Sequence, residues 1–450
     1  MRTPAACPIM RATVSEYNPA QFTRYRVRKR AAHVATVRAM DLGLDGARRR
    51  DRERVACPWV SDRIREQLRG AVRDVMSSSS HIVVVSNYLP PNGGGVEFVA
   101  DALAREYAAA GHRVTVAGYD TCAGAGFTAP YQRVALGGWN GLERRSVPLP
   151  ILGPRALLKL RRLVRHADAV HIHGLAYLSS FAALLSLRRA TPNVVTEHVG
   201  IVDYDSAAMT RAQRLALAFG ARLAAWRRSQ VVVLNDRVAA DVRAVAPRLE
   251  IRKLPNGVDL NQFRPPSGEE RAALRARFKI DSPAVLVVAR NARKKRLDLV
   301  VDVATAMPAT RFVICGRGTE TLAGVASNVR LLGEVDRATV AMLYQSCDAL
   351  LLPSESEGLP LVVLEAMASG LPVVMGDDPD VARELPEGVI TVRRNVDAVR
   401  AALDELLGPE AAPSIDARTA VAGFDWRAIA ESYLRLLCDP TKPEAVGDRR

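Results

Sequence analysis

Two carboxylates stand eight residues apart in the segment 354–374, SESEGLPLVVLEAMASGLPVV. The apolar run before it predicts the end of a buried strand, and Pro360 suits the first turn of a helix that ends at Gly370. Eight residues at about 100° each bring Glu365 back to roughly the face on which Glu357 lies. The pair can therefore line one site, and the free N–H groups of the helix start would suit a phosphate or diphosphate there.

The two glutamates also have a simpler explanation, because acidic residues near a helix start often only cap the helix and bind water. Two cations argue for a ligand site instead. Arg290 ends the predicted strand 284–290 and Lys295 follows it, and a planar guanidinium beside a point-charged ammonium suits two phosphate groups. Three neighbouring cations are expected to be solvated: Arg293, Lys294 and Arg296. Of these, Lys294 is the other candidate for the role of Lys295.

Pairs of glycines follow two other predicted strands. Gly316 and Gly318 come directly after strand 311–315, where residues without side chains would let a nucleotide approach the backbone. Gly94 and Gly95 join the first strand to its helix, where the helix N-terminus would meet a diphosphate or an acceptor. A tight turn explains the second pair equally well, and a lone G-x-G is a weak signal. The dinucleotide fingerprint G-x-G-x-x-G is absent from this glycine loop.

Histidines offer a further site and a metal alternative. His198 ends the predicted strand 193–198, and ligands in such sheets bind beyond the carboxyl ends of the strands, although an isolated histidine is often structural. His171 and His173 share one strand face but lack a third ligand, so no metal is expected. The D-x-D triplet 203–205 lies in a polar loop away from the strand context of a metal motif. It is interpreted as an acceptor-side loop.

From residue 81 the chain alternates apolar strands with helices, which predicts parallel sheets with helices on both faces. Asn-Gly and Pro-Pro pairs in 254–266 mark a boundary between two halves. We therefore predict an α/β fold of two Rossmann-like, doubly wound domains that face a cleft. The predicted segments are a basic, disordered leader 1–77, an acceptor domain 78–262, a nucleotide-sugar domain 263–425, a closing helix 426–438 that packs on the first domain, and a tail 439–450.

This combination of motifs resembles the retaining glycosyltransferases of family 4, enzymes with the two-domain GT-B fold, over nearly all of the chain beyond the leader. By resemblance, Glu365 grips the ribose hydroxyls of a nucleotide-sugar and Glu357 touches the sugar being transferred. His198 would hydrogen-bond that sugar near its reactive carbon, and Arg290 and Lys295 would hold the diphosphate. The resemblance places the nucleotide or base against Gly94, Gly95, Gly316, Gly318, Glu334, Val335, Gly358 and Leu359.

Length and composition agree with an enzyme of two domains plus extra segments, since 450 residues exceed one ordinary core. No uninterrupted apolar run approaches the roughly 18 residues of a spanning helix, and the start of the sequence has no credible signal peptide. Six cysteines without a C-x-x-C pair predict reduced thiols and a cytoplasmic protein.

The net charge of +15 is unevenly distributed, because residues 1–80 hold 17 Lys+Arg and 8 Asp+Glu, and so carry +9. The remaining +6 fits an anionic substrate or an anionic lipid surface as well as nucleic acid. We expect the functional protein to start near Met76; the alternative is a basic arm that binds membrane or nucleic acid. The apolar, Arg-rich segment 212–228 fits a membrane-surface helix and, equally, a buried amphipathic helix.

The sequence therefore predicts a cytoplasmic, retaining hexosyltransferase, peripheral at the inner membrane face if its acceptor is lipid-linked. It would use a UDP- or GDP-sugar and a glycan, lipid-linked or small-molecule acceptor, with no cofactor, metal or nucleic acid. A double displacement needs a carboxylate about 3 Å from the anomeric carbon. Glu357 is assigned to sugar binding, so same-face attack is favoured. The alternatives are a nucleotide-sugar epimerase of the same fold and a non-catalytic binder of sugar-nucleotides or nucleic acid.

Overall fold

The computed structural model describes residues 79–90, 94–120, 127–141, 149–201, 206–355, 357, 359–378, 381, 384–408 and 417–438. The chain divides into two compact units, Met1–Ser77 and Ser78–Arg450, and every described element belongs to the second. The leader 1–77 and the tail 439–450 lie outside the described residues, so what was expected of them stays a prediction, as do the domain bounds.

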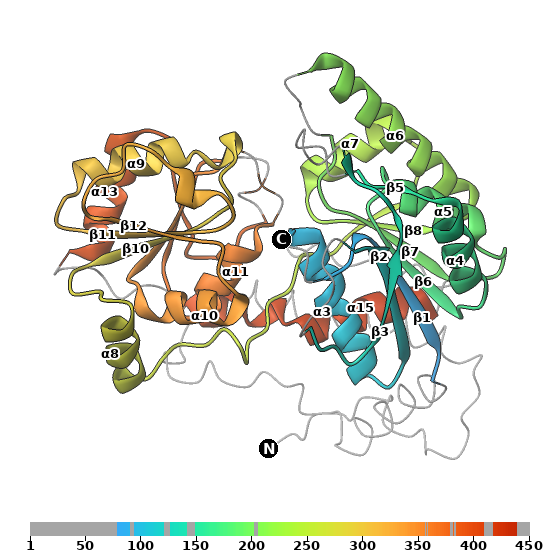
Figure 1. The fold of residues 1–450 in the computed structure, drawn as a ribbon, viewed down its shortest axis with the longest axis horizontal. Helices are drawn as coiled ribbons and strands as arrows, with labels where there is room; N and C mark the ends of the chain where they lie inside the picture. The colour runs from blue at the N-terminus through green and yellow to red at the C-terminus, as the bar shows by residue number, and fades with distance from the viewer. Residues whose placement is uncertain are drawn as a thin grey trace, which may run out of the picture. The chain divides into compact units, whose positions relative to one another are not determined.

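The first half of the second unit is built on a seven-stranded parallel sheet in the order β3-β2-β1-β6-β7-β8-β9 (Figure 1). Its strands are β1 (His81–Tyr88), β2 (Arg113–Tyr119), β3 (Gln132–Leu136), β6 (Ala169–His173), β7 (Asn193–Glu197), β8 (Gln230–Val233) and β9 (Ile251–Lys253). Its helices are α3 (Gly95–Ala109), α4 (Pro154–Arg165), α5 (Leu178–Ser186), α6 (Ala207–Trp226) and α7 (Asp236–Val245). A short antiparallel pair, β4 (Gly138–Trp139) and β5 (Ile151–Leu152), lies outside the sheet.

The second half repeats this plan with a six-stranded parallel sheet in the order β12-β11-β10-β13-β14-β15. Its strands are β10 (Ala284–Val288), β11 (Arg311–Cys315), β12 (Val329–Gly333), β13 (Ala349–Leu352), β14 (Val373–Gly376) and β15 (Ile390–Val392). Its helices are α8 (Gly268–Arg277), α9 (Leu297–Ala306), α10 (Arg337–Ser346), α11 (Leu361–Ala368), α13 (Val396–Leu407) and α14 (Ala417–Val421), with short 3₁₀ turns η3 (Arg293–Lys295), η4 (Thr319–Thr321) and η5 (Ala422–Phe424).

Strand alternation explains why helices cover both faces of each sheet. In β10, Val285 and Val287 pack in one core with α9 and α13, whereas Leu286 packs in another with α10 and α11. In β6, Val170 and Ile172 join the core under α4 to α7, and His171 and His173, which alternate with them, point to the opposite face. That opposite face of the first sheet is covered by α3 and by the last helix of the chain.

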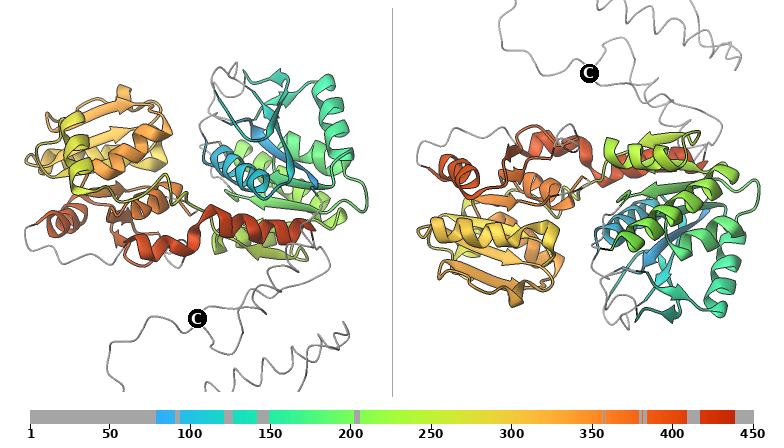
Figure 2. Two further views of the ribbon diagram at one scale, coloured as in Figure 1. Left: turned by 90° about the horizontal axis from the view of Figure 1, so that it is seen from below. Right: turned by 90° about the horizontal axis from the view of Figure 1, so that it is seen from above.

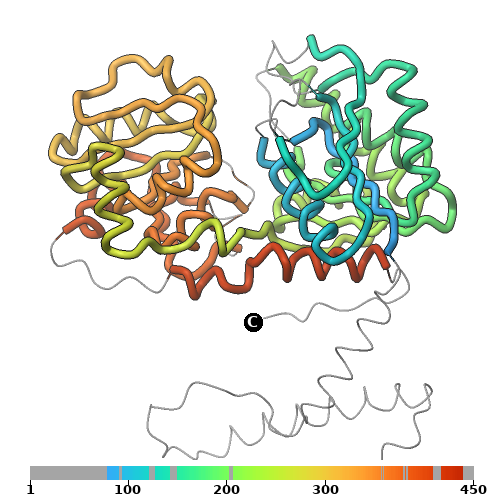
Figure 3. Tube along the Cα trace, turned by 60° about the horizontal axis from the view of Figure 1, so that its bottom comes forward, coloured from blue at the N-terminus to red at the C-terminus, as the bar shows by residue number. Residues whose placement is uncertain are grey.

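The last helix, α15 (Trp426–Cys438), returns from the second half to the first. It contacts α3, β6 and β7, and Figures 2 and 3 show it in red, running along that side of the first sheet. Tyr433 on this helix is fully buried, and its phenol oxygen accepts a hydrogen bond of 3.2 Å from the hydroxyl of Thr196 in β7. The prediction of two parallel α/β sheets with a helix crossing back to the first domain is confirmed.

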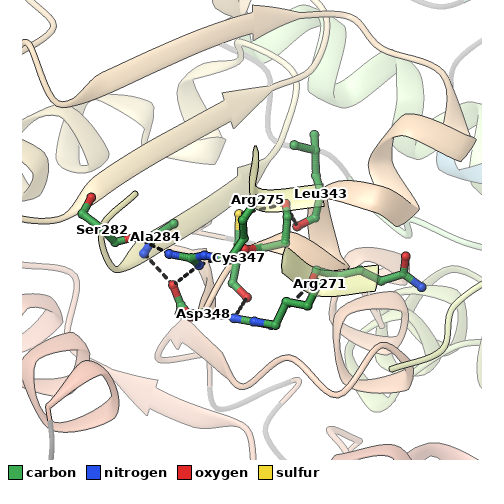
Figure 4. Close-up of polar contacts among 9 residues, drawn as sticks. Arg271, Arg275, Ser282, Ala284, Leu343, Cys347 and Asp348 are labelled. Carbon is green, nitrogen blue, oxygen red and sulfur yellow. Dashed lines mark hydrogen bonds and ion pairs between the residues drawn. The ribbon is translucent and has the colours of Figure 1, made fainter. Parts of the chain in front are cut away.

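Helix α8 is fixed to the amino ends of two strands of the second sheet by Asp348, which lies just before β13 (Figure 4). Its carboxylate accepts hydrogen bonds from Arg271 at 2.6 Å, from Arg275 at 3.0 Å and from the backbone N–H of Ala284 at 2.8 Å. This cluster lies at the amino ends of the strands. It therefore stabilises the fold and is not part of a ligand site at the carboxyl ends.

Some elements differ from the sequence-based expectation. The segment after β2 was expected to be a loop, but it contains the edge strand β3. Two further elements, α7 and β9, were not predicted and follow the last predicted strand of the first half. Pro360 is the N-cap of α11 instead of a residue of its first turn, and Gly370 follows the helix with a positive φ of 77°. Proline fits this N-cap because its own N–H is not needed there, and glycine tolerates the left-handed conformation that ends a helix.

Candidate functional site

The second sheet has its topological switch point between β10 and β13, which lie side by side while the chain leaves them toward opposite edges. Ligands of such sheets bind where the loops after these two strands separate. The loop after β10 carries Arg290 and Lys295, and the loop after β13 carries Glu357. The Lys295 ammonium donates a hydrogen bond to the Glu357 carboxylate, and the two side chains are only 16% and 11% exposed. Two predicted site residues are thus brought into contact.

Further cations surround this pair. Lys294 is partly buried, and burial lowers its pKa; the nearby charges of Lys295, Arg290 and Arg237 lower it further, while Glu357 opposes them. The expectation that Lys294 is solvated is therefore wrong for its ammonium group, because the η3 turn directs it into the same cluster. Mutual repulsion among these cations makes the cluster a favourable site for an anion.

The other two cations next to Lys295 in the sequence, Arg293 and Arg296, lie outside this cationic cluster. Arg293 is exposed, as expected. Arg296 is partly buried and donates hydrogen bonds to Asp298 at 3.1 Å and to Glu355 at 3.4 Å.

Arg237 is a site residue that the sequence analysis missed. It lies in the first turn of α7, beyond the carboxyl end of β8, and donates a hydrogen bond of 3.2 Å to the backbone carbonyl of Glu357. Its position after a parallel strand is the signal that would have identified it. Through Arg237 the first half of the chain contacts the loop that carries Glu357.

Glu365 lies on α11 and is buried, with a different set of partners from Glu357. Arg337 donates to one of its carboxylate oxygens at 2.7 Å and the Tyr344 hydroxyl to the other at 3.2 Å. Burial raises the pKa of Glu365, while Arg337 and Tyr344 act in the opposite direction. The guanidinium of Arg337 also lies 5.2 Å from the ring centre of Phe98 in α3. Arg337 is thus a second cation that the sequence analysis missed.

The glycines after β11 have a structural requirement of their own. A Cβ on Gly316 would lie 2.2 Å from the carbonyl oxygen of Ala289, and its φ is +137°. Close packing against the backbone after β10 therefore demands glycine at this position. Gly318 also has a positive φ, of 79°. Their approach to a nucleotide stays a prediction.

The remaining predicted base-pocket residues lie in different surroundings. Glu334 is exposed and pairs with Arg317 at 3.4 Å, and Val335 packs partly into the second core. The side chain of Leu359 is buried in that core, and its carbonyl oxygen accepts a hydrogen bond of 2.8 Å from Asn256. A ligand could therefore meet Leu359 only through its backbone. Gly358 lies outside the described residues.

Glu97 adds a titratable group to the start of α3. Gly94 is the N-cap of this helix, and a Cβ there would lie 2.1 Å from a carboxyl oxygen of Glu97, whereas Gly95 has open space beside it. Burial raises the pKa of Glu97 to about 7, against the opposing effect of backbone N–H groups and of Arg290. The helix start that was expected to meet a diphosphate or an acceptor thus already holds a carboxyl group.

His198 directly follows β7 and is 7% exposed. The preceding residue, Glu197, fixes the local backbone. Its carboxylate accepts hydrogen bonds from the backbone N–H groups of Leu175 at 2.6 Å, Val199 at 3.1 Å and Gly200 at 3.3 Å. The ring nitrogen Nε2 of His198 lies 2.9 Å from Nδ1 of His173 in β6. His198 is therefore held at the carboxyl end of the first sheet, where a ligand-binding histidine was predicted.

Within the described ranges, no three His, Cys, Asp or Glu side chains come together in a way that could hold a metal ion. The D-x-D triplet 203–205 lies outside those ranges, so its interpretation as an acceptor-side loop stays a prediction. Across the same described part of the chain, no helix combines the length and apolar character needed to cross a bilayer.

Comparison with known proteins covers both halves. The family described as Glycosyltransferase Family 4 matches residues 93–262, and the family described as Glycosyl transferases group 1 matches residues 270–421. The chain is 30% identical over 346 residues to the D-inositol 3-phosphate glycosyltransferase of Mycobacterium leprae (strain Br4923), an alignment that covers 69% of this chain and 79% of that protein.

Two further proteins extend the comparison. Over 362 residues the chain is 28% identical to the GDP-mannose-dependent alpha-(1-6)-phosphatidylinositol monomannoside mannosyltransferase of Mycobacterium tuberculosis (strain CDC 1551 / Oshkosh), covering 73% of this chain and 89% of that protein. Among solved structures, Anabaena Alr3699/HepE in complex with UDP and glucose superposes with a TM-score of 0.64 at 17% identity, covering 80% of this chain and 99% of that one.

Proposed function

Because this chain belongs to the family 4 glycosyltransferases and has their GT-B fold, we propose that it transfers a hexosyl unit from a UDP- or GDP-sugar with retention of anomeric configuration. The observation that carries this proposal is the cationic cluster at the switch point of the second sheet. Lys295 pairs there with Glu357 while Arg290, Lys294 and Arg237 add positive charge. A sugar-diphosphate supplies the matching anion beside a sugar-binding carboxylate.

The cluster would act mainly on the leaving group. As the bond between the anomeric carbon and the diphosphate breaks, negative charge grows on the departing phosphate oxygen, and fixed cations stabilise that charge. For this, Lys295 exchanges Glu357 for phosphate when the donor binds, which frees the Glu357 carboxylate for the hydroxyls of the sugar. The departing oxygen takes the proton of the acceptor hydroxyl as the new bond forms on the same face. Protein cations supply the charge compensation in this scheme, so we propose a metal-independent reaction.

The acceptor is proposed to be a glycan, a lipid-linked sugar or a small polar molecule such as a cyclitol. The two mycobacterial relatives are named for a phosphatidylinositol mannoside and for inositol 3-phosphate, and the first is named for GDP-mannose. The Anabaena structure contains UDP and glucose. These names set the donor and acceptor panels for an assay.

The apolar stripe on α6 supports contact with a membrane surface at which a lipid-linked acceptor would be presented. Leu215, Phe219 and Trp226 lie on one face of this helix and are 65%, 49% and 64% exposed. The guanidinium carbon of Arg227 lies 4.0 Å from the ring centre of Trp226. Burial lowers the pKa of Arg227, and the nearby positive charge of Arg189 lowers it further. Apolar side chains beside clustered arginines suit an anionic lipid surface. We propose that the protein is cytoplasmic and binds the inner membrane face peripherally.

Vesicle flotation tests this membrane contact. The full chain should float with vesicles of phosphatidylcholine and phosphatidylglycerol but not with phosphatidylcholine alone. Replacement of Phe219 and Trp226 by serine should abolish flotation, whereas the same change at the exposed Leu158 of α4 serves as the control. Flotation that is unaffected by the double substitution would contradict the proposal.

Release of free nucleotide from a panel of UDP-, GDP- and ADP-sugars tests the catalytic proposal. The full chain should turn over one donor slowly without an acceptor, and faster with the matching acceptor. Lys295→Ala and Glu365→Ala should abolish this turnover, whereas Arg293→Ala, in the same loop but exposed, should retain it. Chelation with EDTA should leave the rate unchanged. Isomerisation of the donor would indicate an epimerase instead, and donor binding without any turnover across all acceptors would indicate a non-catalytic binder.

A further inference from the structure

The contact between His173 and His198 indicates which ring nitrogen of His198 is protonated. Strands β6 and β7 are parallel neighbours with His173 paired opposite Thr196, which brings His198, two residues further on, beside His173. The distance from Nδ1 of His173 to Nε2 of His198 is 2.9 Å, and the ring planes are 18° apart. This is a hydrogen bond between two imidazoles, and one of them must donate.

Both rings are neutral at physiological pH. Burial lowers the pKa of His198 to about 4, and it lowers the pKa of His173 well below the ordinary value, with His171 and His198 adding to the effect. A neutral imidazole has one N–H and one bare nitrogen. The hydrogen bond therefore has two arrangements, and each fixes whether the other nitrogen of His198 donates or accepts.

The far nitrogen of His173 decides between these arrangements. Its Nε2 is buried and has no hydrogen-bond partner among the described residues. If His173 accepted at Nδ1, its own proton would be on Nε2 as a buried N–H group without an acceptor. If His173 donates from Nδ1, the unpartnered atom is only a bare nitrogen. Orphaned buried N–H groups are rarer than orphaned acceptors, so the second arrangement is favoured.

The supporting ring, His171, holds His173 in place. The Tyr107 hydroxyl lies 3.0 Å from its Nδ1, and Thr196 Oγ1 lies 2.8 Å from its Nε2. Since the Thr196 hydroxyl donates to Tyr433, its oxygen accepts from His171, and the Nδ1 of His171 then accepts from Tyr107. Both nitrogens of His171 are satisfied, and its ring packs against His173 with centres 4.3 Å apart. Hydrogen bonds that involve residues of α3, β7 and α15 therefore hold the packed rings of His171 and His173 in place.

We propose that His173 is a positioning residue that donates from Nδ1 to Nε2 of His198 and thereby holds His198 in the tautomer with its proton on Nδ1. His198 then offers a ligand a hydrogen-bond donor. The natural partner is an uncharged hydroxyl oxygen, such as one on the transferred sugar. This inference rests on the proposed function for the identity of the ligand, but the tautomer itself does not depend on it.

Nitrogen-15 NMR of the full chain, labelled in its seven histidines, tests the tautomer directly. Signals are assigned with His171→Asn, His173→Asn and His198→Asn variants. We expect His198 at pH 7.5 to show a protonated, pyrrole-type Nδ1 and a bare, pyridine-type Nε2, and His173 to show the same. A protonated Nε2 on His198 would overturn the proposal. This measurement needs no donor, so it stands whether or not the protein transfers sugar.

Donor turnover tests the consequence. His173→Leu keeps the volume but removes the donor, so kcat should fall about tenfold, as expected for one lost hydrogen bond in the transition state, with the donor KM within about twofold. His173→Asn keeps an N–H near the position of Nδ1 and should recover most of the rate. Equal losses in both variants, with thermal unfolding midpoints like wild type, would contradict the positioning role. Absence of turnover in the wild-type chain would instead count against the proposed function.

Discussion

At the scale of single residues, Glu97 is an acid whose ionisation opposes folding. Its pKa of about 7 in the fold exceeds the ordinary value of 4.5, so between these pH values the folded chain binds more protons than the unfolded chain. Stability therefore decreases as pH rises from about 4.5 to 7, by roughly 3 kcal/mol if Glu97 alone is considered. No such cost exists below pH 4.5, where both states are protonated.

Glu97→Gln should remove this pH dependence. The neutral amide should raise the thermal unfolding midpoint at pH 8 and leave it nearly unchanged at pH 5, with a gain of on the order of 1–3 kcal/mol at the higher pH. The matched control is Glu106→Gln on the same helix, where burial raises the pKa less and the gain should be smaller. A gain of equal size at pH 5 and pH 8 would show that Glu97 is not the group that titrates.

Gly316, directly after β11, has the closest Cβ contact among the described glycines of the second half. Gly316→Ala would force a Cβ against the Ala289 carbonyl and should cost roughly 3 kcal/mol or more, because neither the backbone nor its φ can relax cheaply. Gly324→Ala, at a positive φ with open space, should cost only about 1 kcal/mol. Urea unfolding of both variants measures the difference, and similar midpoints would contradict the assigned contact.

At the scale of elements, α8 depends on the Asp348 cluster. Asp348→Asn should weaken both arginine contacts and cost about 1–2 kcal/mol, since these side chains are only partly buried. The exposed pair Arg400 and Asp404 provides the control, and Asp404→Asn should cost less than about 0.5 kcal/mol. Affinity for the donor, measured by calorimetry, should be unchanged in both variants because Asp348 lies at the far ends of the strands.

Elements with strong apolar runs could be predicted from the sequence, and elements defined by tertiary contacts could not. Strands β1 and β10 contain continuous runs of apolar residues, and α15 is periodic, so each was predicted. Strand β3 has two exposed or half-buried polar residues in five, and its pairing with β2 decides its conformation. Local sequence carries little of that information.

The same division applies to the candidate site. Arg290, Lys295 and Glu357 were predicted because short motifs place them at or after the ends of predicted strands. Arg237 was missed because it comes from the other half of the chain and acts on a backbone carbonyl. Glu365 was predicted, but its partners Arg337 and Tyr344 were not, since only the packing of α10 on α11 brings them together.

At the scale of the whole molecule, α15 makes the C-terminal end of the described chain part of the first sheet's core. Tyr433→Ala should cost about 3–5 kcal/mol, because a fully buried aromatic ring is lost next to His171 and Thr196. Tyr433→Phe removes only the acceptor for Thr196 and should cost about 1 kcal/mol. Arg435→Ala, exposed on the same helix, is the control. Equal unfolding midpoints for all three variants would show that α15 does not stabilise the first sheet.

The Lys295–Glu357 pair has a consequence for how strongly any diphosphate binds. The protein carries its own counter-ion at this position, so a diphosphate that bound there as proposed would bind by ion exchange instead of simple addition. Part of the gain from each phosphate contact is offset by the broken internal pair, and this offset applies to substrate and product alike. In the proposed transfer, Glu357 would return to Lys295 as the nucleoside diphosphate departs, so the resting pair would speed product release and weaken product inhibition.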